Sequence, residues 1–345
     1  MTSEAIRVVN LSEMDPSWNW LGSSTEWSEP LDWTHSSVRS VAVPEWIPRE
    51  TTWRRIIAAW RAAMWLRRKM SILVSHGPRM TMYGSLALSS QFKRRRHLAY
   101  SFNFTELPQG VTRKLMSAAF KSVDRFVCFS NMERELYAEH FDLDIDRIDM
   151  MHWAARPPSF DPSARRAVAG DYFCAIGSQG RDYAVLLAAM KTLPSIKLVL
   201  VATPASLAGL EIPKNVEVHC NIALDKAMNI LQGSRFAVVP LRGSAVPCGH
   251  VTIVAAMHCK KALIVSDSSG IADYVVDGVN GVTVPTNDPK AMAANIERLW
   301  GDPELASRLG YAAQAFAQMQ CGEKAAVDYF QRYLQSSRGP RCIAT

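Results

Sequence analysis

The chain has 345 residues, of which 48% are hydrophobic and 21% charged, a composition typical of globular proteins rather than of disordered chains. This length is sufficient for two hydrophobic cores, because single domains usually contain about 100–200 residues. The seven cysteines are scattered without a Cys-x-x-Cys pair, so we expect a reducing, cytoplasmic compartment. No apolar run reaches the roughly 20 residues that span a bilayer, so we expect neither a membrane span nor a secretory signal.

The net charge of +7 is distributed unevenly along the chain. Residues 51–125 contain 15 Lys or Arg against two acids, whereas the first fifty residues contain eight acids against three Arg. A concentrated basic block usually faces an anionic partner such as lipid head groups, nucleic acid or a phosphorylated substrate. A solvated helix face is the alternative.

Short β-branched runs alternate with helix-length segments, which predicts βαβ units and parallel sheets. Two sets of six strands indicate two doubly wound α/β domains, with a seam in residues 154–170, where prolines and glycine interrupt any regular pattern. We predict strands at Ala5–Asn10, Ser40–Val43, Ser71–Ser75, Arg96–Phe102, Arg125–Phe129 and Ile148–His152, then at Tyr172–Ile176, Lys197–Val201, Val216–His219, Phe236–Pro240, Ala262–Ser266 and Gly281–Val284.

Helix signals are clearest near the C-terminus. Asp288-Pro289 forms an N-cap and first-turn pair that predicts a helix to about Trp300, and Asp302-Pro303 predicts a second helix ending near Gly310. Apolar spacing predicts a final helix over residues 322–335.

An ordered set of motifs resembles the C-terminal domain of GT-B glycosyltransferases. It comprises Gly249–Met257, Lys260–Asp267, Gly270–Val275, then Asp277-Gly278, Asn280-Gly281 and Val284-Pro285, with Val127–Ser130 upstream. The resemblance implies two Rossmann-like domains, residues 1–155 for the acceptor and 156–319 for a nucleotide-sugar, with a C-terminal helix (320–345) returning to the first. Many retaining members carry two glutamates where this chain has Pro247 and Ala255, so that subfamily's mechanism does not transfer directly.

Glycine-containing loops after two predicted strands suit a diphosphate. Gly249 precedes a helix from about Val251, where free backbone amides and a partial positive charge would bind an anion, and Thr252 adds a hydroxyl. In the loop 177–183, Arg181 offers a fork of donors for phosphate oxygens, although pairing with Asp182 or a surface acid is the alternative. The donor-binding residues implied by the resemblance are Gly177, Ser178, Gly180, Arg181, Asp182, Asn221, Ile222, Leu241, Arg242, Ser244, Gly249, His250, Val251 and Thr252.

Two side chains after strands of the first half are candidate catalytic bases. His76 follows the strand at Ser71–Ser75, and Glu106 follows the next strand; either would accept the acceptor hydroxyl's proton if transfer inverts the anomeric centre. A structural role is the alternative for both, and His152 and His250 are weaker candidates. With Arg181 stabilising the departing diphosphate, the resemblance implies catalysis without a metal or other cofactor.

Residues Trp53–Lys69 predict a helix with a tryptophan-bearing apolar face and basic neighbours. Such a helix suits the surface of an anionic membrane, and the cluster Lys93–Arg96 would strengthen the contact. The alternative is that the apolar face packs on the first domain's sheet. Six tryptophans between residues 18 and 53 would stack on a sugar acceptor or cover the sheet.

The sequence therefore predicts a glycosyltransferase that moves a sugar from a nucleoside diphosphate to an acceptor hydroxyl, lipid-linked or in a surface polysaccharide, at the inner membrane face. A non-catalytic nucleotide- or glycan-binding scaffold on the same fold is the main alternative, because fold does not establish activity. A nucleic-acid binder is disfavoured, since no recognised module interleaves aromatic and basic residues.

Overall fold

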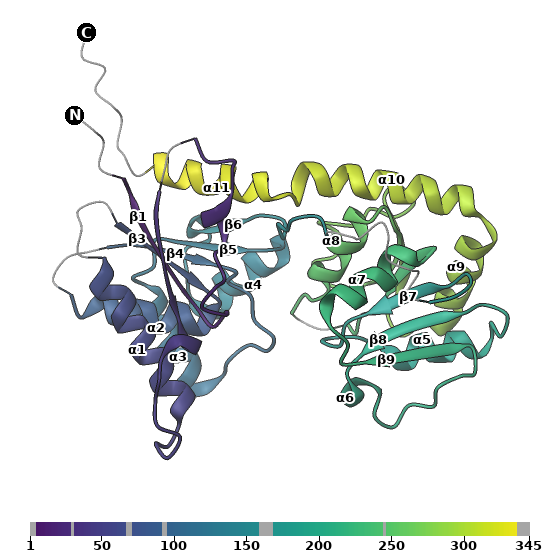
Figure 1. Cartoon of the computed structure of the whole chain (residues 1–345), viewed down its shortest axis with the longest axis horizontal. Helices are drawn as coiled ribbons and strands as arrows, with labels where there is room; N and C mark the ends of the chain where they lie inside the picture. Colours follow the sequence, from purple (N-terminus) through teal and green to yellow (C-terminus); the bar gives the residue numbers. More distant parts are fainter. Residues whose placement is uncertain are drawn as a thin grey trace, which may run out of the picture. The chain divides into compact units, whose positions relative to one another are not determined.

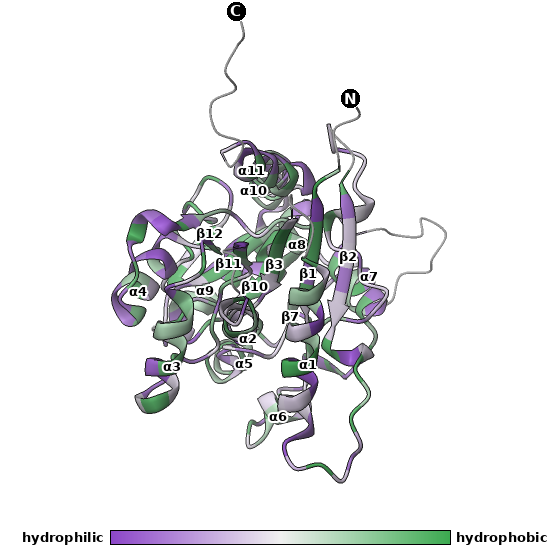
Figure 2. Ribbon diagram, turned by 90° about the vertical axis from the view of Figure 1, so that its left-hand side faces the viewer, coloured by the Kyte–Doolittle hydropathy of each residue, from purple (hydrophilic) through white to green (hydrophobic). Residues whose placement is uncertain are grey.

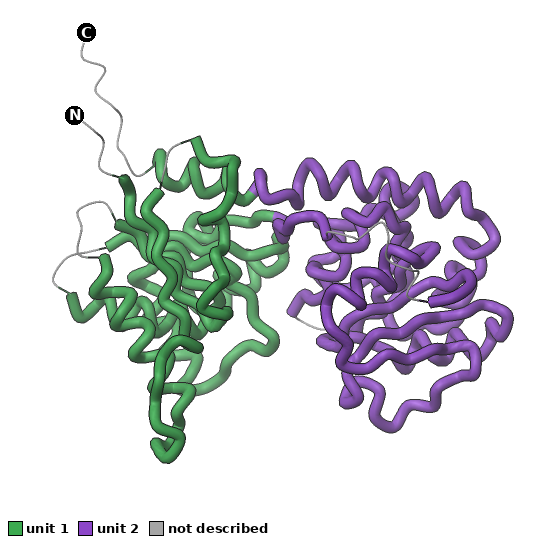
Figure 3. Tube along the Cα trace, in the orientation of Figure 1, with its two compact units in different colours: residues 1–151, 326–345 green, residues 152–325 purple. Residues whose placement is uncertain are grey.

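A computed structural model describes residues 5–28, 31–66, 71–91, 95–158, 168–243 and 246–336. The chain forms two compact units, one of residues 1–151 with 326–345 and one of residues 152–325 (Figure 3). The chain passes from one unit to the other after Met151 and returns within the last helix, after Ala325. Each unit is an α/β structure built around its own parallel sheet (Figure 1).

The first unit contains a six-stranded parallel sheet in the order β2-β1-β3-β4-β5-β6. The strands are β1 (Arg7–Ser12), β2 (Asp32–Ser37), β3 (Ser71–His76), β4 (Arg96–Tyr100), β5 (Arg125–Cys128) and β6 (Ile148–Met150). Four helices connect them and contact one another in sequence, so they form one layer: α1 (Glu50–Trp65), α2 (Pro78–Ser89), α3 (Gly110–Phe120) and α4 (Asn131–Phe141). Short 3-10 turns lie at Leu21–Ser23, Val38–Ser40 and Ile145–Arg147.

The prediction of a strand at Ser40–Val43 is wrong. Val41 and Val43 are buried against α1, but in a non-strand segment, and the strand of this region is the more polar β2. β2 lies at the sheet edge, where one row of backbone groups pairs with β1 and four of its six residues remain partly exposed. An edge strand of this kind carries little apolar alternation, which is why the sequence pattern favoured the valines instead.

Aromatic side chains cover the sheet face opposite these helices. Ala99 of β4 belongs to the helix-facing core, so its neighbour Tyr100 points to the other side, where its ring lies 4.5 Å from that of Trp20. Trp20 and Trp33 in turn contact Phe330 of the C-terminal helix. Of the two roles open to the tryptophans, these rings serve to cover the sheet.

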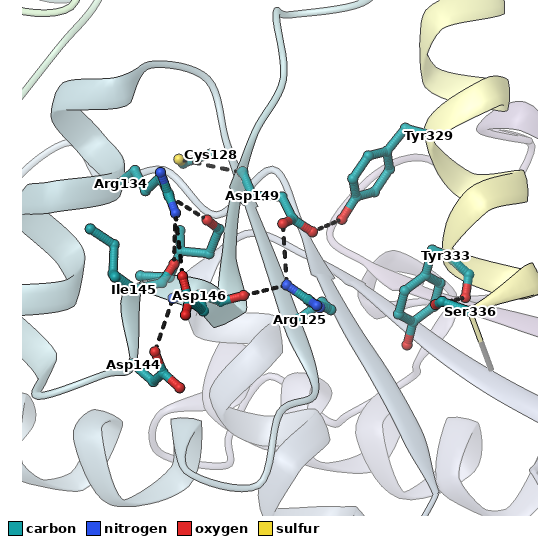
Figure 4. A network of polar contacts seen from close by, with 11 residues as sticks. Arg125, Cys128, Arg134, Asp144, Ile145, Asp146, Asp149, Tyr329, Tyr333 and Ser336 are labelled. Atoms are coloured by element: carbon teal, nitrogen blue, oxygen red, sulfur yellow. Dashed lines mark hydrogen bonds and ion pairs between the residues drawn. The ribbon is translucent and has the colours of Figure 1, made fainter. Parts of the chain in front are cut away.

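The C-terminal helix α11 (Glu323–Gln335) is fixed to the first unit by polar contacts. Tyr329 donates a hydrogen bond of 2.7 Å to Asp149 of β6, and Arg125 donates to the other carboxylate oxygen (Figure 4). Tyr333 lies one helical turn after Tyr329. The Arg96 guanidinium of β4 lies 4.1 Å from the centroid of its ring and donates to its carbonyl oxygen. The helix predicted over residues 322–335 is confirmed.

The second unit also contains six parallel strands, in the order β12-β11-β10-β7-β8-β9. They are β7 (Phe173–Ile176), β8 (Leu198–Ala202), β9 (Val216–Cys220), β10 (Phe236–Val239), β11 (Ala262–Asp267) and β12 (Val282–Pro285). The helices are α5 (Tyr183–Lys191), α6 (Pro204–Leu207), α7 (Leu224–Gly233), α8 (His250–His258), α9 (Pro289–Gly301) and α10 (Pro303–Gln320).

Alternate residues of the central strands serve two separate cores in this unit. Phe173 and Ala175 belong to the core beneath α5 and α9, whereas Cys174 belongs to the core beneath α7, α8 and α10. A sheet buried on both faces has near-continuous apolar strands, and β8 and β10 are buried at every residue. This is the doubly wound arrangement that the sequence predicted.

The helix after Asp302 does not end near Gly310 but continues to Gln320. Gly310 is a packing glycine: a Cβ there would lie 2.2 Å from the carbonyl oxygen of Lys260. Gly310 therefore allows α10 to approach the start of β11 closely and does not end the helix. The N-cap at Asp288 is confirmed, since its side chain accepts hydrogen bonds from Lys290 and Ala291.

Candidate functional site

Two loops meet at the carboxyl ends of β7 and β10, which are neighbours in the second sheet. The Asp182 amide donates to the Pro240 carbonyl at 2.9 Å, and the Arg242 amide donates to the Gly180 carbonyl at 3.0 Å. Arg181 and Leu241 complete this pairing as an isolated antiparallel bridge. The loop after β7 is therefore held against the segment that leads into α8. Ligands of open parallel sheets bind at this edge.

Two glycines allow the first loop to fold tightly. Gly177 has φ +112°, and a Cβ there would lie 2.7 Å from an Arg181 guanidinium nitrogen. Gly180 has φ +68°, and a Cβ there would lie 2.3 Å from the Cys248 sulfur. Both positions therefore require glycine for backbone conformation and for space.

The Arg181 side chain is buried in this loop, with 6% of its surface exposed. Its guanidinium donates to the carbonyl oxygens of Ile176 and Gln179 and, at 2.8 Å, to Thr252 Oγ1. Among the described residues no carboxylate pairs with it, and burial lowers the pKa of the guanidinium. The predicted alternative, a pair with Asp182, is wrong, because Asp182 caps α5 by accepting from the Val185 amide.

The first turn of α8 faces the same guanidinium. Its N-cap is Gly249, with φ +97°, and no side chain within the described part of the chain caps the turn. The unpaired amides of a first helical turn carry a partial positive charge. Since Arg181 donates to Thr252 within this turn, a buried cation and an open helix N-terminus converge. A buried cation beside an open helix N-terminus is suited to an anion of high charge.

His250, the first residue of α8, is buried and stacked on Tyr274, with the ring centroids 4.6 Å apart. Burial lowers its pKa to about 4, so the ring is neutral at physiological pH. Its Nε2 has no hydrogen-bond partner among the described residues. A buried ring nitrogen without a partner is costly, which marks a position that a ligand atom would satisfy.

The remaining residues implied for the donor occupy varied positions. Ser178 accepts a hydrogen bond from the Thr203 amide, and Asn221, with φ +52°, is exposed at the end of β9. Leu241 is fully buried, Ile222 packs on the same core, and Arg242 and Val251 are exposed. Ser244 lies outside the described residues.

The two candidate bases lie in the first unit. His76 is half-buried between the edges of Trp18 and Trp20, and its Nε2 lies 3.4 Å from Asn10 Oδ1. Burial, with a contribution from nearby His35, lowers its pKa to about 3, so His76 is neutral and weakly basic. Glu106 is exposed in a bend after β4.

Sequence reasoning missed the aromatic residues that support this site. Tyr274 contacts His250, and its hydroxyl accepts a hydrogen bond from the Trp153 amide at 2.8 Å. His152, the other weaker candidate base, has its ring centroid 5.0 Å from that of Tyr274 and hydrogen bonds the Asp273 carbonyl, so it has a structural role. Tyr274 stood within the recognised motif Gly270–Val275, but nothing in its spacing indicated these contacts.

Residues 172–302 match the family model described as glycosyl transferases group 1. An uncharacterized glycosyltransferase of Methanocaldococcus jannaschii is 26% identical over 110 residues, 32% of this chain and 30% of that protein. A D-inositol 3-phosphate glycosyltransferase of Streptomyces bingchenggensis is 33% identical over 88 residues, 26% of this chain and 19% of that protein. The matched stretch therefore spans less than a third of either relative.

Solved structures share the fold over nearly the whole chain. Sucrose-phosphate synthase from Thermosynechococcus elongatus superposes with a TM-score of 0.72 at 16% identity, covering 96% of this chain and 99% of that one. HepE of Anabaena, in complex with UDP, superposes with a TM-score of 0.69 at 13% identity, covering 96% and 100%. The expected GT-B fold is confirmed by these likenesses and by the two parallel sheets.

Proposed function

Residues 172–302 form a domain of the glycosyl transferases group 1 family, and on this premise we propose that the chain transfers a sugar from a nucleoside diphosphate to an acceptor hydroxyl. The observation that carries the proposal is the buried Arg181 guanidinium, bonded to Thr252 in the open first turn of α8. A structural neighbour, HepE of Anabaena, was solved with UDP and with UDP-glucose, which supports a nucleotide-sugar as donor.

In this reaction the acceptor oxygen bonds to the anomeric carbon while the bond from that carbon to the diphosphate oxygen breaks. The electron pair of the breaking bond stays on the leaving diphosphate. Arg181 and the amides of the first turn of α8 would stabilise that charge, which is the principal task of the protein. Their charge leads us to propose a reaction that needs no metal ion. We assign the diphosphate to the loops around Gly177, Gly180 and Gly249, where backbone can approach it closely.

The acceptor in this proposal is a glycan that is lipid-linked or part of a surface polysaccharide, at the inner face of the membrane. No described helix is long and apolar enough to cross a bilayer. The acceptor's proton would pass to His76 or Glu106 if the anomeric centre inverts. The His76 imidazole is neutral and so could accept a proton, but its low pKa of about 3 makes it a weak base.

A scaffold that binds a nucleotide without catalysis is the second candidate, favoured by Pro247 and Ala255 at the positions of the two glutamates. Donor hydrolysis separates the two functions. With UDP-sugars and GDP-sugars, an enzyme releases UDP or GDP with turnover, and addition of EDTA leaves the rate unchanged. Binding of the nucleotide without release of product from any donor would identify a scaffold. Binding of no nucleoside diphosphate would overturn the proposal.

A further inference from the structure

Helix α1 exposes large apolar side chains in a regular stripe. Trp53, Ile57, Trp60 and Met64 are 42–48% exposed, and their spacing of four, three and four residues places them on one helix face. Figure 2 shows hydrophobic and hydrophilic residues side by side along this helix. Isolated apolar residues are common at protein surfaces, but a continuous stripe with two tryptophans marks an interaction site.

The opposite face of α1 already packs on the first unit. That face consists of four alanines, Ala58, Ala59, Ala62 and Ala63, each at most 1% exposed. Small side chains let the helix approach the sheet closely, and they leave the bulky residues outside. The predicted alternative, in which the tryptophan-bearing face packs on the sheet, is therefore wrong.

The neighbouring helices continue this apolar surface. α2 contacts both α1 and α3, so the three lie in one layer (Figure 1). Leu86 of α2 is 54% exposed, and Val111 and Leu115 of α3 are 73% and 60% exposed. We call the exposed side chains of Trp53, Ile57, Trp60, Met64, Leu86, Val111 and Leu115 the apolar layer surface.

Charge on the same three helices is almost entirely positive. α1–α3 carry six basic residues and one acid, Glu50, which pairs with Arg54, while Arg55 pairs with Glu13 outside these helices. Arg79 of α2 and Arg113 and Lys114 of α3 are exposed. A hollow of about 490 Å³ beside α3 is lined by Arg113, Lys114 and Lys121, with Asp142 as its acidic member. Of the basic cluster expected to assist, Lys93 and Arg94 lie outside the described residues, as does Lys69.

We infer that the α1–α3 layer docks on an anionic lipid surface, with the apolar layer surface in the acyl boundary and the basic side chains at the head groups. Tryptophan beside arginine or lysine is suited to this interface, because the ring is apolar while its N–H and the cations remain hydrated. Nucleic acid would match the charge but offers nothing to cover Ile57, Met64 or Leu115. This inference rests on and extends the proposed function, which places the acceptor glycan at the inner face of the membrane.

Vesicle flotation tests the inference without any donor or acceptor. The full chain is mixed with phosphatidylcholine vesicles, with or without phosphatidylglycerol, and the bound fraction is measured. The variant Ile57→Glu/Trp60→Glu adds charge at the centre of the stripe. Both side chains are already partly solvated, so we expect the fold to be retained, and the ligand-free Tm checks this. The matched control is Leu224→Glu, at a side chain of α7 in the second unit that is 75% exposed. UDP-induced thermal shifts of each protein report the donor site separately.

The expected result is binding to the anionic vesicles alone, weakened at least about tenfold by the double variant and by added salt, and unchanged by Leu224→Glu. A wild-type chain that does not float, or a double variant that floats equally, would overturn the inference. So would a dimer in light scattering that dissociates in the double variant without lipid binding, since a second copy would then cover the surface. If the chain does not float but its Tm still rises with UDP, the inference fails while the proposed sugar transfer is not contradicted.

Discussion

Replacement of Arg181 by methionine removes the buried charge while retaining a long, unbranched side chain. Arg181→Met deletes hydrogen bonds to the Ile176 and Gln179 carbonyls and to Thr252, but it breaks no ion pair within the described part of the chain. It also removes the cost of burying a cation. That cost is evident because burial lowers the pKa of the guanidinium. These effects oppose each other, so we expect the unfolding free energy without ligand to change by about 1 kcal/mol or less.

The effect on catalysis is much larger. One unit charge about 4 Å from another is worth about 4 kcal/mol at an effective dielectric constant near 20. Loss of a single donor to a developing oxyanion costs about 10²–10³ in kcat in other enzymes. We therefore expect kcat/KM for sugar transfer to fall by about 10²–10³ in Arg181→Met, with weaker binding of UDP.

Two measurements on the same protein separate function from folding. Saturating nucleotide at about 100 times Kd stabilises a protein by about 2.7 kcal/mol, which raises Tm by several degrees. The wild-type chain should show this rise with UDP or another nucleoside diphosphate, and Arg181→Met should lose most of it while keeping its ligand-free Tm. Equal nucleotide affinity in the two proteins would refute the reasoning, as would a variant whose lost activity is matched by lost structure.

Three further predictions concern the scaffold. Gly310→Ala should lower the free energy of unfolding by about 1–3 kcal/mol in denaturant titration, because the added Cβ would clash with the Lys260 carbonyl. The control Gly301→Ala, whose Cβ would meet no atom within 4 Å, should leave this free energy unchanged or raise it. Equal effects of the two variants would contradict the packing role of Gly310. Tyr329→Phe should cost about 1 kcal/mol and speed hydrogen exchange in α11, and unchanged exchange would show that its bond to Asp149 contributes nothing. Burial lowers the pKa of His97 to about 3, so between pH 6.5 and 3 the unfolded chain binds a proton that the folded chain does not. As the pH is lowered through this range, the free energy of unfolding therefore decreases by about 1.4 kcal/mol per pH unit from this group. His97→Gln should flatten that fall in Tm, and an unchanged slope would assign it to other groups.

The parallel sheets could be predicted because their strands are buried on both faces and read as apolar runs. Phe236–Val239 and Leu198–Ala202 are fully buried examples. β2 could not be predicted, since its sequence Asp32–Ser37 is polar and its place is set by pairing with β1. The end of α10 was misjudged for a related reason: the contact of Gly310 with Lys260 is tertiary, and no local pattern records it.

The candidate site was predictable in its parts but not in its contacts. Gly177, Gly180 and Gly249 stood out as loop glycines, and all three have positive φ. The bond from Arg181 to Thr252 joins residues 71 positions apart, and only the fold brings them together. The unpartnered Nε2 of His250 likewise depends on burial by Tyr274, which sequence spacing does not encode.

The most direct test of the central claim is a crystal structure of the chain with UDP. The account predicts the diphosphate within hydrogen-bond distance of the Arg181 guanidinium and of the backbone amides of residues 250–252. A diphosphate bound elsewhere on the chain, or an empty first turn of α8 at saturating nucleotide, would contradict it.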